Sequence, residues 1–83
     1  MKNLPAVYIL KSQKDARYYY GSTKDLQSRL KRHNSGSVPS TKNRRPLVLH
    51  YSENFASYGE ALQREKFFKT IAGYNWLKEK RII

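Results

Sequence analysis

The sequence predicts a small α+β fold, in which a three-stranded and mostly antiparallel sheet is flanked by helices. Two short runs rich in β-branched and aromatic residues stand on either side of a polar segment, and a third apolar run comes later. Segments in which apolar residues recur at helical spacing follow the second and third runs. The expected order is β-β-α-β-α-α, and three strands in that order exclude a doubly wound parallel sheet.

The first two predicted strands, residues 6–11 and 17–21, read as a hairpin because only a short polar segment separates them. This hairpin places Tyr8 and Tyr19 on neighbouring strands. Gly21 ends the second strand, at a point where the backbone must bend or be approached closely by another group.

The first predicted helix covers residues 25–34. Its apolar and ring side chains recur at helical spacing: Leu26, Leu30 and His33. Either Thr23 or Asp25 can accept hydrogen bonds from the free N–H groups at its start, and Gly36 stands where a helix stop is expected.

Residues 35–46 are rich in Ser, Pro, Asn and Gly and also carry basic side chains, so we expect a basic surface loop there. The aliphatic run at 47–52 predicts the third strand, which we expect to be central or well covered. Ser57 and Glu60 have the spacing of a capping box, and we expect the second helix to run from there to about Ala72, with Gly73 closing it. The apolar residues beyond predict a short final helix or tail.

The charge balance predicts a polyanionic partner. The chain carries 17 Lys and Arg residues against 6 Asp and Glu, a net charge of +11, which attracts polyanions and makes their binding salt-dependent. The alternative is a generally basic surface, as in small ribosome-associated proteins. The absence of cysteine excludes disulfides and cysteine zinc sites. We expect one domain over residues 1–83, soluble and cytoplasmic, because no apolar run has the length of a membrane span.

Glu65 stands on the predicted core-facing stripe of the second helix. An ionised carboxylate in that position is costly unless it is paired or bound to a metal. One interpretation is an ion pair with Lys69, four residues further on. The other is a functional carboxylate.

Arg29 and His33 lie one turn apart beside the apolar stripe of the first helix. Taken singly, Arg29 can extend its stem along the surface, and His33 can be an ordinary C-terminal residue favoured by the helix dipole. Taken together with Tyr8, Tyr19 and Glu65, they form a set that we expect to point at one concave side of the sheet. That set suits phosphodiester cleavage, which needs a carboxylate for a metal ion, a cation for the phosphate and a group that takes a proton from water. We expect a tyrosine beside a metal and an arginine to favour its phenolate form.

These residues resemble the GIY-YIG nuclease superfamily, which is named after two short strand motifs near the N-terminus. The motifs appear here as Ala6-Val7-Tyr8 and Tyr19-Tyr20-Gly21. The resemblance continues, in order, through Gly21-Ser22-Thr23, Asp25-Leu26-x-x-Arg29-Leu30-x-x-x-Asn34, Arg45-Pro46 and Glu60-Ala61-Leu62-x-x-Glu65-Lys66. It covers nearly the whole chain and looks most like bacterial single-domain proteins related to the N-terminal nuclease domain of the excision-repair endonuclease.

The resemblance implies roles for the matching positions. Tyr8 would be the general base or would organise the attacking water, and Tyr19 would hydrogen-bond the phosphate or the water. Arg29 would bind the scissile phosphate, with assistance from His33. Glu65 would hold one divalent metal ion, Mg²⁺ or Mn²⁺.

Other positions complete the expected site. Asn75 is the candidate for an asparagine that often completes such sites near the end of the domain. Ala6 replaces a glycine of the first motif and Tyr20 an isoleucine of the second, and neither change removes a catalytic group. The basic residues expected to contact nucleic acid are Lys24, Lys31, Arg32, Lys42, Arg44 and Arg45.

Three functions remain open at this stage. The first is a metal-dependent endonuclease acting on DNA, with branched, nicked or damaged DNA as candidate substrates and DNA repair as the setting. The second is a nucleic-acid-binding module of the same fold with negligible turnover, and the third is a structural protein of a ribonucleoprotein particle that prefers RNA. We expect a monomer away from the membrane, to which a partner can add targeting.

Overall fold

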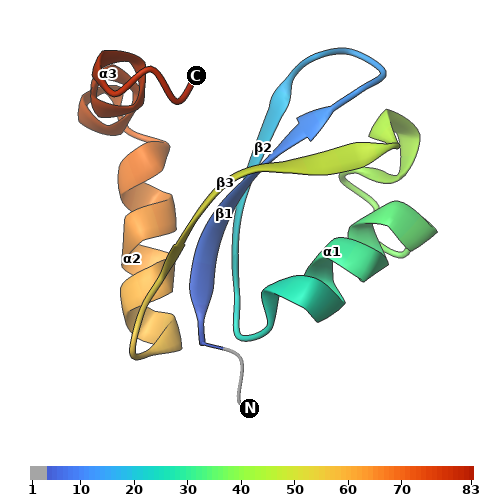
Figure 1. The fold of residues 1–83 in the computed structure, drawn as a ribbon, viewed down its shortest axis with the longest axis horizontal. Helices are drawn as coiled ribbons and strands as arrows, with labels where there is room; N and C mark the ends of the chain where they lie inside the picture. The colour runs from blue at the N-terminus through green and yellow to red at the C-terminus, as the bar shows by residue number, and fades with distance from the viewer. Residues whose placement is uncertain (1–3) are drawn as a thin grey trace.

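The computed structural model describes residues 4–83 and has the predicted α+β architecture (Figure 1). The elements follow the order expected from the sequence, with one short 3₁₀ helix added in the basic loop. They are β1 (Ala6–Ser12), β2 (Tyr18–Thr23), α1 (Leu26–Ser35), η1 (Lys42–Arg44), β3 (Leu47–Asn54), α2 (Tyr58–Phe68) and α3 (Ile71–Glu79). None of the helices in the described part of the chain is long and apolar enough to cross a membrane.

The sheet is antiparallel throughout, with the strand order β2-β1-β3. The first hairpin is confirmed, and its register pairs Tyr8 with Gly21 and Leu10 with Tyr19. The expectation that the third strand is central is wrong, because β3 is an edge strand on which Val48 and Leu49 are each 40% exposed. An aliphatic run predicts a strand but does not fix its place in the sheet, and here the central place belongs to β1.

Helices cover both faces of the sheet, α1 on one side and α2 with α3 on the other (Figure 1). On the α2 side the core contains Val7 and Ile9 of β1 together with Phe68 and Leu77. On the α1 side it contains Tyr8, Leu10 and Leu47. Because side chains alternate along a strand, β1 sends apolar side chains into both layers, which explains its nearly continuous burial.

The predicted limits of α1 are confirmed in their chemistry. The Asp25 side chain accepts a hydrogen bond from the backbone N–H of Ser28, at 3.2 Å, and caps the helix. Gly36 ends it in the left-handed conformation, with φ of +84°. Thr23, the other candidate cap, accepts a hydrogen bond from the backbone N–H of Asp25 instead.

The predicted end of the second helix is wrong, because α2 ends at Phe68 and a separate helix follows. The Thr70 side chain accepts a hydrogen bond from the N–H of Gly73, at 3.0 Å, and begins α3. Gly73 is therefore buried inside α3 and is not a helix stop. A Cβ atom at this position would stand 1.8 Å from the carbonyl oxygen of Phe67, so glycine here permits the close approach of the two helices.

Substitution of this glycine tests the close approach. We expect Gly73→Ala to lower the free energy of unfolding by about 2–3 kcal/mol, because the backbone of α2 must move to accept the methyl group. The matched control is Gly59→Ala on exposed α2, where the nearest atom to the added Cβ is 4.0 Å away. The control should raise stability by about 0.5 kcal/mol through its helix propensity. Urea unfolding of both variants measures the difference, and equal stabilities would contradict this account.

Candidate active site

Tyr8 lies at the centre of a cluster of three rings between the sheet and α1. Its hydroxyl oxygen is 2.9 Å from Nε2 of His33, and the side chain is almost completely buried. The Tyr19 ring lies beside both, with its centroid 6.5 Å from that of Tyr8 and 5.0 Å from that of His33. A Cβ atom at Gly21 would be 2.4 Å from the Tyr8 hydroxyl, so the absence of a side chain there lets the phenol cross β2.

His33 is completely buried and bound at both ring nitrogens. Nε2 contacts Tyr8, and Nδ1 is 2.8 Å from the hydroxyl of Thr41, which is also fully buried. Burial, helped by the nearby charges of Arg29 and Arg32, lowers the pKa of His33 to about 4. The imidazole is therefore neutral at pH 7, and one of its two hydrogen bonds is donated while the other is accepted.

Thr41 is a member of this network that the sequence did not single out. It lies in the polar loop before η1, where a single threonine carries no motif. The loop is held against α1 by Asn34, whose amide group donates to the carbonyl oxygen of Leu47 and accepts from its N–H, both at 2.8 Å. This double contact is the only local signal for the arrangement, and the sequence pattern had marked Asn34 only as part of a motif.

Arg29 connects the ring cluster to an open hollow. Its guanidinium hydrogen-bonds the phenols of Tyr8 and Tyr19, which raises the pKa of Arg29, and the side chain is half-buried. The hollow has a volume of about 460 Å³ and is lined by Ser22, Thr23, Lys24, Arg29, Arg32 and Tyr58. The guanidinium is thus fixed by two phenols at the wall of a basic hollow, a geometry suited to an anion with two or more oxygens.

The protonation state of Tyr8 differs from the expectation. Burial raises the pKa of the phenol, and the charges of Tyr19 and Glu65 add to the rise, while the hydrogen bond and charge of Arg29 lower it. The protein's own groups therefore keep Tyr8 protonated at pH 7 and do not favour the phenolate.

Glu65 comes from the other layer of the fold, so the expectation that all five candidate residues share one face of the sheet is wrong for this residue. It lies on α2, and its Oε1 accepts a hydrogen bond from the hydroxyl of Ser22, at 2.6 Å. Ser22 follows Gly21 on the edge strand β2 and places the carboxylate near the end of that strand. The charge of Glu65 still acts on the Tyr8 phenol from there.

The ion pair between Glu65 and Lys69 is present, as one interpretation of the sequence expected. Lys69 Nζ is 2.7 Å from Oε2 of Glu65, and the glutamate side chain is only 16% exposed. In residues 4–83 no group of three or more His, Asp or Glu side chains is placed to hold a metal ion. A single carboxylate still suits Mg²⁺ or Mn²⁺, because such ions keep several waters and take further oxygens from substrate phosphates.

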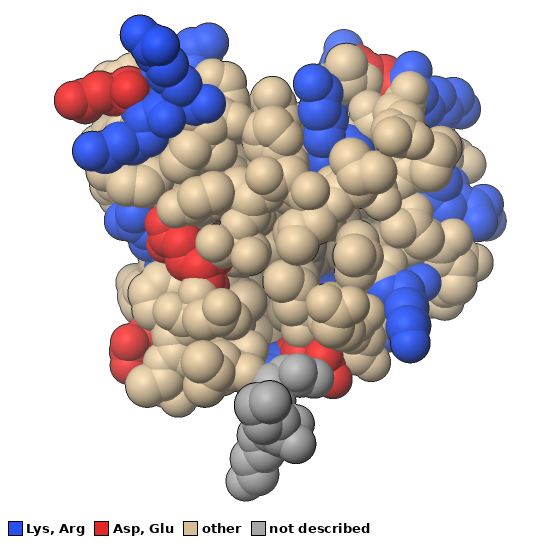
Figure 2. All heavy atoms as spheres, viewed as in Figure 1, with Lys and Arg blue, Asp and Glu red and all other residues tan. Residues whose placement is uncertain are grey.

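The residues predicted to contact nucleic acid have different surroundings. Figure 2 shows Lys and Arg side chains spread along the side of the molecule that α1 and η1 occupy, with others near α3. Lys24 and Arg32 line the hollow beside Arg29, and Lys31 is exposed on α1. Lys42 and Arg45 line a second hollow near η1.

Two further predicted residues stand apart from the ring cluster. Arg44 is held in an ion pair with Asp15 at 3.3 Å, so its guanidinium is already engaged within the fold. Asn75 is exposed on α3, and no hydrogen bond described for residues 4–83 joins it to Glu65 or the phenols.

The buried imidazole predicts a pH dependence of stability. Because folding lowers the pKa of His33 from 6.5 to about 4, the unfolded chain binds more protons between these values. Stability contributed by the neutral ring is complete above pH 6.5 and is lost as the pH falls towards 4, by up to about 3 kcal/mol.

Thermal melting of wild type and His33→Gln between pH 4 and 7.5 measures this effect. We expect the variant to be less stable at neutral pH but to show a flatter profile. His50→Gln, which changes the exposed histidine of β3, serves as the control. Wild-type and His33→Gln profiles of equal slope would show that another group is responsible.

Comparison with known proteins agrees with this geometry. The model of a family described as the GIY-YIG catalytic domain matches residues 4–75. A UPF0213 protein of Bacillus pumilus is 45% identical over 75 residues, covering 89% of this chain and 70% of that protein. One of Staphylococcus haemolyticus is 44% identical over 73 residues, covering 87% of this chain and 88% of that protein.

A more divergent relative is similar over most of its length. A UPF0213 protein of Halobacterium salinarum is 37% identical over 67 residues, covering 80% of this chain and 86% of that protein. No solved structure matches the chain. The family match spans most of the 83 residues and includes Tyr8, Tyr19, Arg29 and Glu65, and the chain therefore belongs to the GIY-YIG family.

Proposed function

We propose that this protein is an endonuclease that hydrolyses DNA phosphodiester bonds with the help of a divalent metal ion, leaving a 5′-phosphate and a 3′-hydroxyl. Membership of the GIY-YIG family supports a nuclease, and nucleases of this family generally use divalent metals. The observation that carries the proposal is the Arg29 guanidinium, which two phenols hold at the wall of a basic hollow. A phosphate in that hollow meets a fixed bidentate donor.

The chain's own residues divide the work of the reaction. Arg29 holds the scissile phosphate, and Tyr19 hydrogen-bonds the phosphate or the attacking water. Tyr8 organises that water. When Nδ1 of His33 donates to Thr41, Nε2 accepts the hydroxyl proton of Tyr8 and leaves a lone pair of the phenol oxygen for the water. The neutral state of His33 supports this arrangement.

Glu65 is the residue that would hold the metal ion, which we propose to be Mg²⁺ or Mn²⁺. When bound, such an ion offsets the negative charge that develops on the phosphate during attack. Ser22 fixes one carboxylate oxygen by its hydrogen bond, and Lys69 occupies the other in the absence of competition. The exposed ion pair with Lys69 is weak, because water screens its charges, so it presents a small barrier to exchange.

The small size of the domain bears on the substrate. An 83-residue chain offers little surface for contact with base edges, which supports recognition of branched, nicked or damaged DNA by its backbone shape. A role in DNA repair follows as part of the proposal. Single-domain organisation, the monomeric state, a cytoplasmic location and binding to RNA or a targeting partner stay predictions.

A second candidate is a nucleic-acid-binding module of the same fold with negligible turnover. The raised pKa of Tyr8 and the engagement of both Glu65 oxygens favour it, because each opposes a step of the reaction. The basic hollow beside Arg29 serves binding in either case.

Cleavage assays separate these candidates. We expect Arg29→Ala and Glu65→Gln to lower the cleavage rate by about 10²–10³, and Tyr8→Phe by about 10², because each removes a group placed at the reacting phosphate. The measurement is the initial rate on supercoiled, single-stranded and branched DNA with Mg²⁺ or Mn²⁺. Tyr20→Phe is the matched control, since its ring packs beside Phe68 on the opposite face of the sheet.

The outcomes point to different conclusions. If the three variants cleave as fast as wild type, the activity comes from a contaminant. If wild type binds DNA without cleaving it, and Glu65→Gln binds equally well, the protein is a binding module.

A further inference from the structure

The largest hollow described in the chain is not the one beside Arg29. It has a volume of about 570 Å³ and is lined by Lys14, Asn34, Lys42, Asn43, Arg45 and Pro46. We call it the turn hollow, because Lys14 comes from the β1–β2 turn and the others from the segments around η1. It shares no lining residue with the hollow beside Arg29, and α1 connects the two, with Arg29 in one wall and Asn34 in the other.

The cations of the turn hollow are held in place by backbone carbonyls. Lys14 Nζ donates to the carbonyl oxygen of Asn43 at 3.1 Å, and Arg45 Nε donates to that of Lys42 at 2.9 Å. The Arg45 guanidinium also lies against Gly36, where a Cβ atom would be 2.9 Å from one of its terminal nitrogens. Each bond uses one N–H of the side chain, so further donors remain on both cations.

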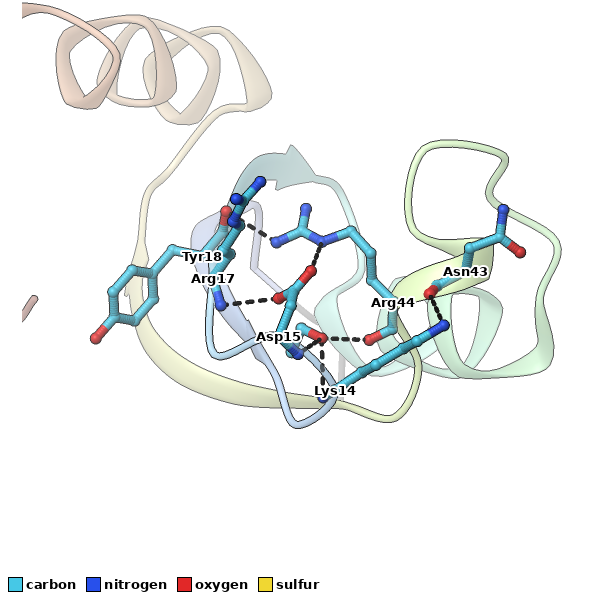
Figure 3. A network of polar contacts seen from close by, with 7 residues as sticks. Lys14, Asp15, Arg17, Tyr18, Asn43 and Arg44 are labelled. Atoms are coloured by element: carbon cyan, nitrogen blue, oxygen red, sulfur yellow. Dashed lines mark hydrogen bonds and ion pairs between the residues drawn. The ribbon is translucent and has the colours of Figure 1, made fainter.

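A network around Asp15 joins the two walls of the turn hollow (Figure 3). The Asp15 carboxylate accepts hydrogen bonds from the backbone N–H of Arg17, at 2.8 Å, and from Arg44 Nε, at 3.3 Å. Arg44 also donates to the carbonyl oxygen of Tyr18, and its own carbonyl oxygen accepts a hydrogen bond from the hydroxyl of Ser12 at 2.6 Å. Arg44 therefore ties η1 to the β1–β2 turn.

The same network removes the nearest negative charge from the turn hollow. Asp15 is paired with Arg44. Among the ion pairs described for residues 4–83, none includes Lys14, Lys42 or Arg45. Three cations thus face one hollow without a carboxylate partner, and repulsion between them is relieved when an anion enters.

We propose that the turn hollow binds a second phosphate of the DNA whose scissile phosphate meets Arg29. This inference deepens the proposed function and rests on it for the identity of the polyanion. Arg29 and Asn34 are five residues apart on α1, a rise of about 7.5 Å. With about 3.4 Å per nucleotide along a B-form strand, the two bound phosphates are at least about two nucleotides apart.

The second phosphate site changes which residues contact DNA. Lys14 joins Lys42 and Arg45 as a phosphate contact, although the sequence pattern left it in a turn. Arg44 acts through its contacts with Asp15 and Tyr18, and it positions the walls of the turn hollow.

The test is a binding measurement without divalent metal, so that it does not depend on catalysis. Fluorescence anisotropy with a labelled 20-base-pair DNA, in EDTA and at several salt concentrations, gives the affinity and its salt dependence. We expect the Lys14→Gln/Arg45→Gln variant to bind roughly tenfold more weakly. The slope of log K against log salt should fall by about one, the value for one lost phosphate contact.

The matched control is Lys78→Gln/Lys80→Gln, which removes the same charge from the end of α3. It should retain nearly the wild-type affinity and slope. Lys42→Gln, whose side chain is exposed, gives an independent arm if the loss of Arg45 disturbs the fold, and we expect it to weaken binding about threefold.

Three results would overturn the inference. They are wild-type affinity and slope in both turn-hollow variants, an equal loss in the α3 control, and a larger loss for RNA of the same length than for DNA. Cleavage results bear separately on the proposed function. A protein that binds DNA through the turn hollow but never cleaves it would overturn the nuclease alone.

Discussion

The hydrogen bond between Tyr8 and His33 fixes α1 against the sheet, and the rest of the site depends on it. A buried hydroxyl and a buried imidazole must be paired, because an unpaired polar group in the interior is costly. Tyr8, His33 and Thr41 satisfy one another in a chain that joins β1, α1 and the loop before η1. In residues 4–83 no buried side-chain nitrogen or oxygen lacks a partner. With α1 held in this rotation, Arg29 lies one turn before His33 and reaches both phenols.

The electrostatics of the site follow from the same packing. Burial keeps His33 neutral and Tyr8 protonated, so the ring cluster itself carries no charge at pH 7. The positive charge stands outside it, on Arg29 and the lysines and arginines of the surface. This separation places an uncharged proton pathway beside a cationic surface, the arrangement expected where an anionic substrate brings the reacting charge with it.

Much of the fold was predictable from the sequence, because local chemistry decides local structure. The hairpin and the caps at Asp25 and Gly36 depend on neighbouring residues only, and they are confirmed. The edge position of β3 and the buried role of Gly73 depend on which elements meet in space, and a sequence pattern does not contain that information. A glycine after a helical run reads equally well as a stop or as a close contact.

The candidate site divides in the same way. Its motif residues could be named because they belong to strands and helices with clear periods. Thr41 could not be named, because its partner His33 is eight residues away across an irregular loop. The layer of Glu65 was also hidden, since helix periodicity orders side chains around one helix and does not say which face of the sheet the helix covers.

The edge strand β3 has a consequence for how the protein behaves at high concentration. An open strand edge with two exposed aliphatic residues is a template on which another chain can add a strand and begin to aggregate. The pairing of β3 with β1 shifts register at His50, which has no partner opposite it. This bulge divides the strand into regular stretches of at most four residues, and it twists the edge between them. An incoming strand therefore finds no long flat edge, and the irregularity protects the exposed flank of the sheet from fibril-like stacking.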